Sequence, residues 1–438
     1  MDSGFDIESD VIVIGAGMAG LTVSRELARE GLAVELLEAR DWAGGRVITA
    51  HSPEHPFPIE LGAEFVHGRP EPTVQLAREA NVELVPLGDR HLIRRGGHFD
   101  DMAAVWQTLA DLFHHANLSP ADLSVAELLE RTSVDPDMHQ LCRDVVEGFE
   151  AAPSDELSVQ SIAEDLSNAA EAPQYRVEGG YRALVSHLEC AVHDAGVCVH
   201  LNCPVRRVDW SKPGCVRAYT VHGRCFEAPR CVVAVPLGVL EADPLRGGIA
   251  FEPALQQLTP AFLQVRPGHA HKIVMCFHDD VWHERWPAEA DFLHLQGELF
   301  NTCWRQSQGS FHQLTVWAGG PKSLELGRQS EASRLDLALR SVALLLGESE
   351  AHVRAALVDW WQHDFNADPT ARGAYSYVRR GGFSATQALR EPLAEQLFFA
   401  GEATDHMYPG TVAGAIASGH RVAAQILHGA APRRLALA

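Results

Sequence analysis

A chain of 438 residues exceeds the size of about 250–300 residues at which a single hydrophobic core stops growing, so we expect two domains. Its 46% hydrophobic and 21% charged residues are typical of a globular protein and exclude a largely disordered one. The formal net charge of −22 argues against nucleic acid as a partner, because phosphate binding needs clustered Lys and Arg. An acidic cleft would attract cationic small molecules, although an ordinary acidic surface has the same charge.

The cysteines and histidines show no metal-binding pattern. The nine cysteines are an odd number without a Cys-x-x-Cys pair, and the histidines lack His-Glu-x-x-His spacing. We therefore predict reduced thiols and no metal site. The acidic N-terminus has no secretory-signal pattern, and the apolar run 11–23 is too short to span a bilayer. We expect a soluble cytoplasmic protein without a membrane partner, and either a monomer or a homodimer is compatible with the sequence.

The first predicted unit is a strand, a helix and a second strand. Residues 11–14 form a continuous β-branched run, which is typical of a strand buried in a parallel sheet. Glycines follow, and apolar residues then recur at helical spacing over about 19–29. Residues 33–38 predict the second strand. Together they form a βαβ unit of roughly thirty residues.

Helical and strand patterns then alternate along the chain. Between about residues 75 and 170, Leu, Ala and acidic residues at helical spacing predict a mostly helical insertion. Strand patterns return later, and a predicted helix lies at 333–347. The later strand patterns lie at 196–210, 226–240, 271–277, 311–319 and 396–401. A final helix rich in Gly and Ala is predicted over 412–427, so the chain crosses between two domains several times.

A glycine-rich loop joins the first strand to the first helix. Gly15 permits the tight turn, Gly17 lets the backbone approach a pyrophosphate, and Gly20 lets helix and strand pack closely. The helix N-terminus offers free N–H groups to a phosphate. Glu38, at the end of the second strand, can accept hydrogen bonds from a ribose diol. In this context the loop predicts a dinucleotide site.

Two further motifs place polar groups near such a site. Arg46 follows two glycines and suits a bidentate phosphate contact, although a surface salt bridge is an equal alternative. Near the C-terminus a predicted strand delivers Glu402. Thr411 and Val412 then open a helix whose N-terminal N–H groups can face an electron-rich ring edge.

These motifs resemble those of the flavin-containing amine oxidases, which include monoamine oxidases, polyamine oxidases, lysine-specific histone demethylases and L-amino-acid oxidases. The resemblance covers nearly the whole chain and rests on GAGMAG, EARDWAGGR, LGAEFVHG, VEGGY, VVAVPLGVL, HKIVMCF, ARGAYSYV and FFAGEAT…YPGTVAGAIASG. It implies an α/β fold, with a Rossmann-type FAD-binding domain interleaved with an α+β substrate domain of an antiparallel sheet flanked by helices. We assign the FAD-binding domain to 1–80, 177–262 and 388–438, and the substrate-binding domain to 81–176 and 263–387.

The resemblance also implies the residues that hold FAD. Glu38 and Arg40 would hold the adenosine side, Arg46 would lie near the pyrophosphate and flavin, and Val205 matches a backbone contact to adenine. FAD should be non-covalent, because Ala374 stands where monoamine oxidases carry the attaching cysteine. The complete predicted cofactor set is Gly15, Gly17, Gly20, Glu38, Arg40, Gly45, Arg46, Gly62, Ala63, Glu64, Phe65, Val205, Glu402, Thr411 and Val412.

Within that set the resemblance places five residues along the flavin and its ribityl chain. Glu64 and Phe65 would run beside the isoalloxazine, Glu402 would lie at the ribityl and pyrophosphate region, and Thr411 with Val412 at the pyrimidine end. Glu64 could alternatively pair with an ammonium group.

Four residues are predicted to act on the substrate or on oxygen. The resemblance implies that Lys272 holds a water near flavin N5 and assists the reaction with oxygen. A lysine on an apolar strand is costly to bury unless it is paired, and the alternative is a lysine that points outward from an edge strand. Tyr375 matches one aromatic wall of the family's amine cage, whereas Thr411 stands where monoamine oxidases have a second tyrosine. His67 matches a substrate-side residue of polyamine oxidases, with a core or surface histidine as the alternative.

Other conspicuous side chains are assigned structural roles. Tyr377 should lie on the strand face opposite Tyr375. The aromatic residues Trp360, Trp361 and Phe365 are interpreted as core. The acidic residues Glu147 and Glu150 are interpreted as part of a solvated helix face.

The resemblance implies an FAD-dependent oxidase that deaminates a primary or secondary amine, with O2 reduced to H2O2. A site with one aromatic wall favours a polyamine or a bulky monoamine. An L-amino-acid oxidase is the nearest alternative and would need Arg372 or Arg379 to grip a carboxylate. A desaturase or porphyrinogen oxidase of the same fold, and a non-catalytic flavin-binding scaffold, are less favoured. A histone demethylase is disfavoured because no coiled-coil insertion or chromatin-binding domain is visible in the sequence.

Overall fold

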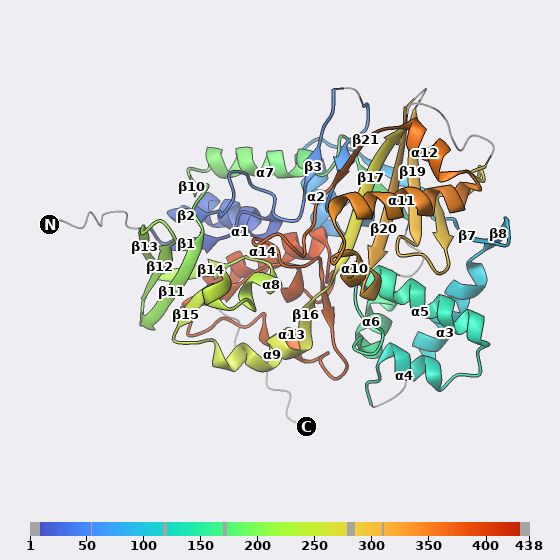
Figure 1. Cartoon of the computed structure of the whole chain (residues 1–438). Coiled ribbons are helices and arrows are strands. Elements are labelled where there is room, and N and C mark those ends of the chain that lie inside the picture. The colour runs from blue at the N-terminus through green and yellow to red at the C-terminus, as the bar shows by residue number, and fades with distance from the viewer. Residues whose placement is uncertain are drawn as a thin grey trace.

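The computed structural model describes residues 9–53, 55–116, 121–169, 173–277, 285–308 and 311–429. Two large sheets organise the chain, a parallel one on the left of Figure 1 and a mixed one on the right. The parallel sheet has the order β10 (Cys198–His200), β2 (Val34–Leu37), β1 (Val11–Ile14), β14 (Arg230–Val233) and β23 (Leu397–Phe399). Its strands come from three distant segments, as the predicted interleaving requires.

Alternation along the strands gives the parallel sheet two apolar faces. Val11 and Val13 pack with the helices α1 (Met18–Arg29), α7 (Arg182–Asp194) and α14 (Val412–His428). Ile12 and Ile14 point to the other face and pack against a separate four-stranded sheet. That sheet has the order β13 (Cys225–Ala228), β12 (Cys215–Thr220), β11 (Val205–Lys212) and β15 (Ala250–Glu252). Burial on both faces explains the unbroken β-branched run of β1.

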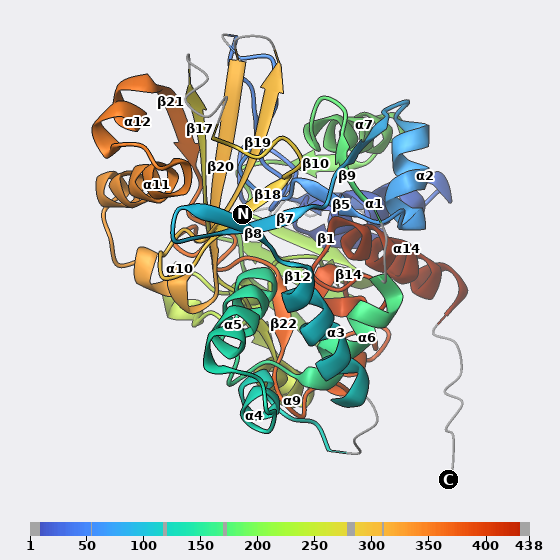
Figure 2. The same ribbon diagram turned by 90° about the vertical axis from the view of Figure 1, so that its right-hand side faces the viewer.

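The mixed sheet has seven strands, of which only the pair β18–β7 is parallel. Its order is β21 (Leu357–Gln362), β17 (Ala270–Phe277), β20 (Phe311–Gly319), β19 (Thr302–Gln308), β18 (Phe292–Leu295), β7 (His91–Arg95) and β8 (His98–Asp101). The helices α11 (Glu331–Leu346) and α12 (Glu350–Ala356) cover one face, as Figures 1 and 2 show. On that face Ile273, Val316 and Leu293 enter an apolar core.

The predicted helical insertion is only partly correct. Three strands, β6 (Leu84–Leu87), β7 and β8, occupy its first part. Their sequences are only four or five residues long and lack β-branched runs, and pairing of β6 and β7 with distant strands holds them in place. The helices then form a separate group below the mixed sheet in Figure 2. They are α3 (Ala103–Ala116), α4 (Val125–Glu130), α5 (Pro136–Glu150) and α6 (Val159–Ala169).

Shorter elements complete the described chain. A three-stranded sheet has the order β5 (Phe65–His67), β9 (Gln174–Val177) and β6. The remaining strands are β3 (Thr49–Ala50), β4 (Ile59–Glu60), β16 (Val265–Pro267) and β22 (Ser376–Val378). The remaining helices are α2 (Glu71–Glu79), α8 (Leu237–Leu240), α9 (Thr259–Gln264), α10 (Pro321–Leu326), α13 (Ala385–Ala388) and the 3-10 turns η1 (Pro244–Arg246), η2 (Gln256–Leu258) and η3 (Glu402–Thr404).

The predicted fold class is confirmed. The predicted domain boundaries stay predictions. All nine cysteines are free thiols. Within the described residues, no helix has the length and apolarity needed to cross a bilayer, and no three His, Cys, Asp or Glu side chains gather as a metal site.

Candidate flavin and amine site

The glycine loop lies at the carboxyl end of β1, beside the ends of β14 and β23. In parallel sheets this edge is where ligands bind. Gly20 packs so closely that a Cβ there would lie 1.8 Å from the Gly15 carbonyl oxygen. Gly17 caps α1 without any side-chain hydrogen bond, and a Cβ on it would meet only the Gly45 Cα, at 3.8 Å. The loop therefore leaves backbone N–H groups of the helix start for an anion, as its sequence predicts.

Glu38 lies beside this loop with its carboxylate already bound to backbone. Its Oε2 accepts the Ala16 N–H at 2.7 Å and its Oε1 accepts the Arg40 N–H at 2.9 Å. Burial raises the pKa of Glu38 above its ordinary value. The segment leading to Val205 runs alongside, since Cys203 N–H donates to the Glu38 carbonyl oxygen at 2.7 Å. The predicted adenosine-side residues are thus brought together, and lone pairs remain on Glu38 for a ribose.

Two arginines face the neighbouring part of the site. Arg40 donates to the Gly45 carbonyl at 2.6 Å and pairs with Asp368. Arg46 forms an ion pair with Glu402 at 2.8 Å and donates to the Ala374 carbonyl. A surface salt bridge is excluded for Arg46, because its partner Glu402 is buried.

Glu402 connects this region to the strand that carries Tyr375. Its second oxygen accepts the Ser376 hydroxyl at 2.6 Å, while Arg46 holds Ala374. Both neighbours of Tyr375 in the chain are thereby fixed by the Arg46–Glu402 pair. A small cavity lies here, lined by Arg46 and Glu402 together with apolar side chains at the ends of β14 and β23.

The donor set fits FAD in its predicted place. A helix start without a side-chain cap and a glycine cradle suit the pyrophosphate, and Glu38 suits a ribose. Gly62 and Ala63 lie against the Arg46 backbone, with Ala63 N–H donating to the Arg46 carbonyl at 3.3 Å. The loop that leads to Glu64 therefore continues from the glycine cradle toward the mixed sheet.

Lys272 is buried on β17, in the interior of the mixed sheet, so the edge-strand alternative is wrong. Its Nζ donates to Glu64 Oε2 at 2.5 Å and lies 3.4 Å from the Gly62 carbonyl oxygen. Glu64 also accepts from Arg176 Nη2 at 3.0 Å and from Trp304 Nε1 at 2.9 Å. Burial alone would raise the pKa of Glu64, but Lys272 and Arg176 outweigh it and hold the pKa below its ordinary value.

The register of the mixed sheet explains why these side chains meet. Residues directly opposite each other on antiparallel strands point to the same face. Lys272 is opposite Trp317, which is opposite Thr302, and Trp304 lies two residues along from Thr302. The face opposite the apolar core of α11 therefore presents one lysine and two tryptophans to the site.

Tyr375 stands in front of this face. Its ring is parallel to that of Trp317, with an interplanar angle of 1° and ring centroids 6.5 Å apart. The Tyr375 hydroxyl donates to the Phe149 carbonyl, and Trp317 Nε1 donates to the Gly148 carbonyl at 3.0 Å. Burial, followed by the charge of Glu150, raises the pKa of Tyr375. The end of α5 thus orients both rings.

Glu150 does not belong to an open solvated face, so that interpretation is wrong. Burial raises its pKa to about 7 although part of its side chain is accessible. The charge of Glu150 also contributes to the raised pKa of Tyr375, so the two side chains lie near each other. Glu147, by contrast, accepts the Ser154 N–H at 3.0 Å and closes the end of α5.

His67 is the last residue of β5, and its surface exposure and its pKa also point in different directions. Its side chain is exposed by area, yet burial lowers its pKa, and it contacts Gln174 on β9. Its substrate-side role stays a prediction. Thr411 instead caps α14, accepting the Gly414 N–H at 3.1 Å and donating to the Tyr408 carbonyl at 2.7 Å. The Thr411 hydroxyl therefore makes its hydrogen bonds within its own segment. Gly410, just before α14, lies close to Tyr375, since a Cβ on it would be 3.6 Å from the Tyr375 Cβ.

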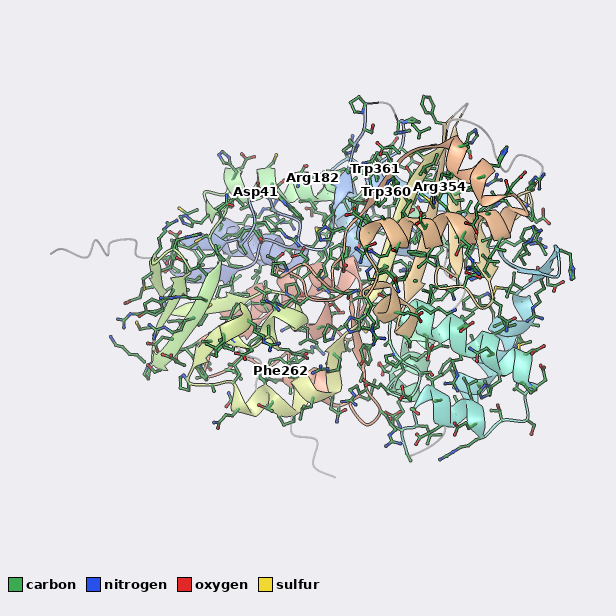
Figure 3. The ribbon with its side chains drawn as sticks, in the orientation of Figure 1. Asp41, Arg182, Phe262, Arg354, Trp360 and Trp361 are labelled. Carbon is green, nitrogen blue, oxygen red and sulfur yellow. The ribbon has the colours of Figure 1, made fainter. Side chains whose placement is uncertain are left out.

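Of the aromatic residues interpreted as core, Phe365 is buried, whereas Trp360 and Trp361 are half-buried. Trp360 and Trp361 are on the edge strand β21, as Figure 3 shows. Trp360 packs on the core of α11, and Phe365 is buried. Tyr377 is buried away from Tyr375, with its hydroxyl on Glu156 at 2.5 Å. Phe65 joins the site side instead, packing edge-on against Trp304 at 5.3 Å.

Sequence reasoning missed Arg176, Trp304 and Trp317, and misplaced Glu150. For Arg176 a signal existed, because β9 alternates Tyr175 and Val177 in the core with Gln174 and Arg176 on the other side. The two tryptophans depend on the pairing register of β17, β19 and β20, which no local pattern in the sequence gives.

Known proteins resemble this chain over nearly its whole length. Lysine-specific histone demethylase 1 homolog 2 of Oryza sativa subsp. japonica is 28% identical over 98% of this chain and 58% of its own length. Polyamine oxidase 4 of the same plant is 26% identical over 93% of this chain and 86% of its own. The chain thus spans little more than half of that demethylase homologue, and 30% of another from Arabidopsis thaliana.

Solved structures share the fold. Cyclohexylamine oxidase from Brevibacterium oxydans IH-35A has a TM-score of 0.81 at 20% identity, covering 96% of this chain and 99% of its own. Wild-type putrescine oxidase bound to putrescine gives 0.79 at 20% identity, with 96% and 99% covered. The model of the family described as flavin containing amine oxidoreductase matches residues 18–427. The chain therefore belongs to this family, and its cofactor is FAD.

Proposed function

We propose that the protein is an FAD-dependent oxidase of a diamine, a polyamine or a bulky monoamine. For a primary amine, R–CH2–NH2 + O2 + H2O gives R–CHO + NH3 + H2O2. Bound FAD would supply the electron chemistry, which is acceptance of a hydride equivalent from the carbon next to nitrogen and delivery of the two electrons to oxygen. The observation that carries the proposal is the buried Lys272 in a charged cluster on the sheet face that Tyr375 also borders.

The chain's own residues have separable tasks in this reaction. Tyr375 and Trp317 border the amine with apolar ring surface and keep water from the C–N bond. Lys272 holds a water on the flavin side and serves the reaction with oxygen. The Arg46–Glu402 pair fixes the segment around Tyr375 against the cofactor. Ala374 offers no sulfur for attachment, which supports non-covalent FAD.

Glu150 supports a substrate with a second positive charge. Its carboxylate lies near Tyr375, burial raises its pKa to about 7, and in the described part of the chain no cation forms an ion pair with it. A desolvated carboxylate without a partner is unfavourable when charged. An ammonium group at the far end of a diamine or polyamine would neutralise it.

An L-amino-acid oxidase is the runner-up, and the two candidate arginines disfavour it. Arg372 donates to the Pro369 and Arg246 carbonyls. Arg379 pairs with Glu156 at 3.1 Å. Arg176 does face the site, but its guanidinium already forms an ion pair with Glu64. The cytoplasmic location and a monomer or homodimer also stay proposals.

The test is anaerobic mixing of the purified yellow protein with 1,4-diaminobutane, spermidine, benzylamine and L-leucine. Bleaching of the flavin absorbance near 450 nm reports oxidation of each compound. We expect the diamine or polyamine to bleach it fastest and L-leucine not to bleach it. Fastest bleaching by L-leucine would establish the amino-acid oxidase, and bleaching by none would leave a flavin-binding scaffold.

A further inference from the structure

Glu64 is the centre of a buried ion cluster that includes two cations. Its side chain is 3% exposed, that of Lys272 5% and that of Arg176 16%. These three residues come from positions far apart in the chain, and Trp304 from a fourth. A buried charge is tolerated only when it is paired and hydrogen-bonded. The cluster satisfies that condition only with all of its members in place.

The two oxygens of Glu64 have different partners. Oε1 accepts Arg176 Nε at 3.1 Å, Arg176 Nη2 at 3.0 Å and Trp304 Nε1 at 2.9 Å. Oε2 accepts only the Lys272 ammonium among the described contacts. Arg176 and Trp304 therefore fix the carboxylate through Oε1, and this leaves Oε2 for Lys272.

The ammonium of Lys272 is in turn fixed on the side of the cofactor loop. The ammonium donates a hydrogen bond to Glu64 Oε2. It also lies 3.4 Å from the Gly62 carbonyl oxygen and 5.5 Å from the centre of the Trp304 ring. A free lysine side chain would lose rotamer freedom, and therefore entropy, if it were held in such a position. A prearranged carboxylate offsets that cost.

We propose that Glu64 is the positioning residue of Lys272, and that Arg176 and Trp304 act through Glu64 to hold the lysine at the flavin. This inference rests on the proposed function, because the reaction of reduced flavin with oxygen is where the placement of Lys272 matters. Glu64 acts through its contact with the Lys272 ammonium.

Glu60 provides a matched control four residues earlier. It is as deeply buried as Glu64, and burial raises its pKa to about 7. Its oxygens accept the Tyr181 N–H at 2.6 Å and the Thr49 hydroxyl at 2.7 Å, both neutral donors. Glu60→Gln therefore removes a buried carboxylate of the same segment without removing the partner of Lys272.

The first experiment separates the two half-reactions of the flavin-loaded protein. In Glu64→Gln we expect reoxidation of reduced flavin by oxygen to slow at least fivefold, while anaerobic reduction by the best amine changes less than twofold. Glu60→Gln should leave both rates within twofold. Unchanged or faster reoxidation in Glu64→Gln would overturn the proposal, and so would an equal loss in both half-reactions.

The second experiment needs no turnover. The chain has only three lysines, Lys212, Lys272 and Lys322, so amine acetylation followed by mass spectrometry resolves each one. In the wild-type holoprotein we expect Lys272 to react far more slowly than the exposed Lys212. Glu64→Gln should raise the ratio of Lys272 to Lys212 labelling at least threefold, and Glu60→Gln should not.

The labelling also separates this inference from the proposed function. If no amine bleaches the flavin but Lys272 is protected in the wild type and released in Glu64→Gln, the oxidase proposal fails and the pairing stands. Labelling of wild-type Lys272 as fast as Lys212, or no change in Glu64→Gln, would overturn the pairing even in an active oxidase. The comparison of Lys272 with Lys212 in the wild-type protein can overturn the pairing even if Glu64→Gln folds poorly, because it does not use the variant.

Discussion

The nucleotide end and the reactive end of the site are built in different ways. At the nucleotide end, glycines and helix N–H groups supply the contacts, and Gly15, Gly17 and Gly20 lie within six residues of chain. At the reactive end, charged and aromatic side chains from four distant segments converge on Glu64. The nucleotide end therefore depends on the space that its glycines leave, whereas the reactive end depends on the balance of charge among its side chains.

That contrast predicts the largest effect at the glycine loop. In Gly20→Val the added atoms would overlap the Gly15 carbonyl, since even a Cβ would lie 1.8 Å from it. Overpacking typically costs 1–3 kcal/mol and occasionally more, so we expect a loss of at least about 3 kcal/mol and no bound flavin. Denaturant unfolding and absorbance near 450 nm measure both. Gly148→Ala, where a Cβ meets nothing within 4 Å, is the control, and a yellow, stable Gly20→Val protein would refute the close packing.

The junction of the two ends should respond next. Arg46→Met leaves the buried Glu402 with Ser376 but without its cation. Breaking a buried pair costs about 3–5 kcal/mol, and the 24% exposure of Arg46 places the expected loss near roughly 3 kcal/mol. Arg207→Met removes an exposed pair with Glu252 and should cost less than about 1 kcal/mol. Equal losses in the two variants would show that the junction carries no special weight.

A pH titration examines the reactive end alone. The pKa of Glu150 is about 7, so its carboxyl is neutral at pH 6 and charged at pH 8.5. The preference for 1,4-diaminobutane over butylamine, expressed as the ratio of kcat/KM values, should therefore rise roughly tenfold over this range, equivalent to about 1.4 kcal/mol. Both substrates carry a reacting amine that titrates in the same way, so its effect on kcat/KM divides out of the ratio.

Glu150→Gln should abolish that rise, because the amide has no charge to gain. Glu147→Gln, at the structural end of α5, should retain it. A preference that stays flat in the wild-type protein would remove Glu150 from the substrate site.

The smallest effect is expected at the tyrosine. Tyr375→Phe loses the hydrogen bond to the Phe149 carbonyl and keeps the ring beside Trp317. The free energy of unfolding should fall by about 1 kcal/mol, and KM should change by less than about threefold. Tyr377→Phe, which loses its bond to Glu156, should show a similar stability loss with no change in KM. A large change in KM for Tyr375→Phe would assign the hydroxyl itself to the amine.

The same contrast explains how much could be predicted from the sequence. The βαβ unit, the glycine loop and Glu38 are local in the chain, and the structure has them as expected. The family resemblance predicts a role for Lys272, but the identity of its partner, Glu64, depends on the fold. Arg176, Trp304 and Trp317 required the strand register. Glu150 looked solvated because helical spacing does not reveal which other segments cover a helix end.

The reaction of reduced flavin with oxygen in wild-type protein and in Lys272→Met tests the central claim most directly. The protein is first reduced anaerobically with its best amine and then mixed with oxygenated buffer, and recovery of absorbance near 450 nm is followed. We predict at least a tenfold slower recovery in Lys272→Met, with the anaerobic reduction little changed. Recovery at the wild-type rate would contradict the account, because a buried, paired Lys272 would then have no part in the chemistry.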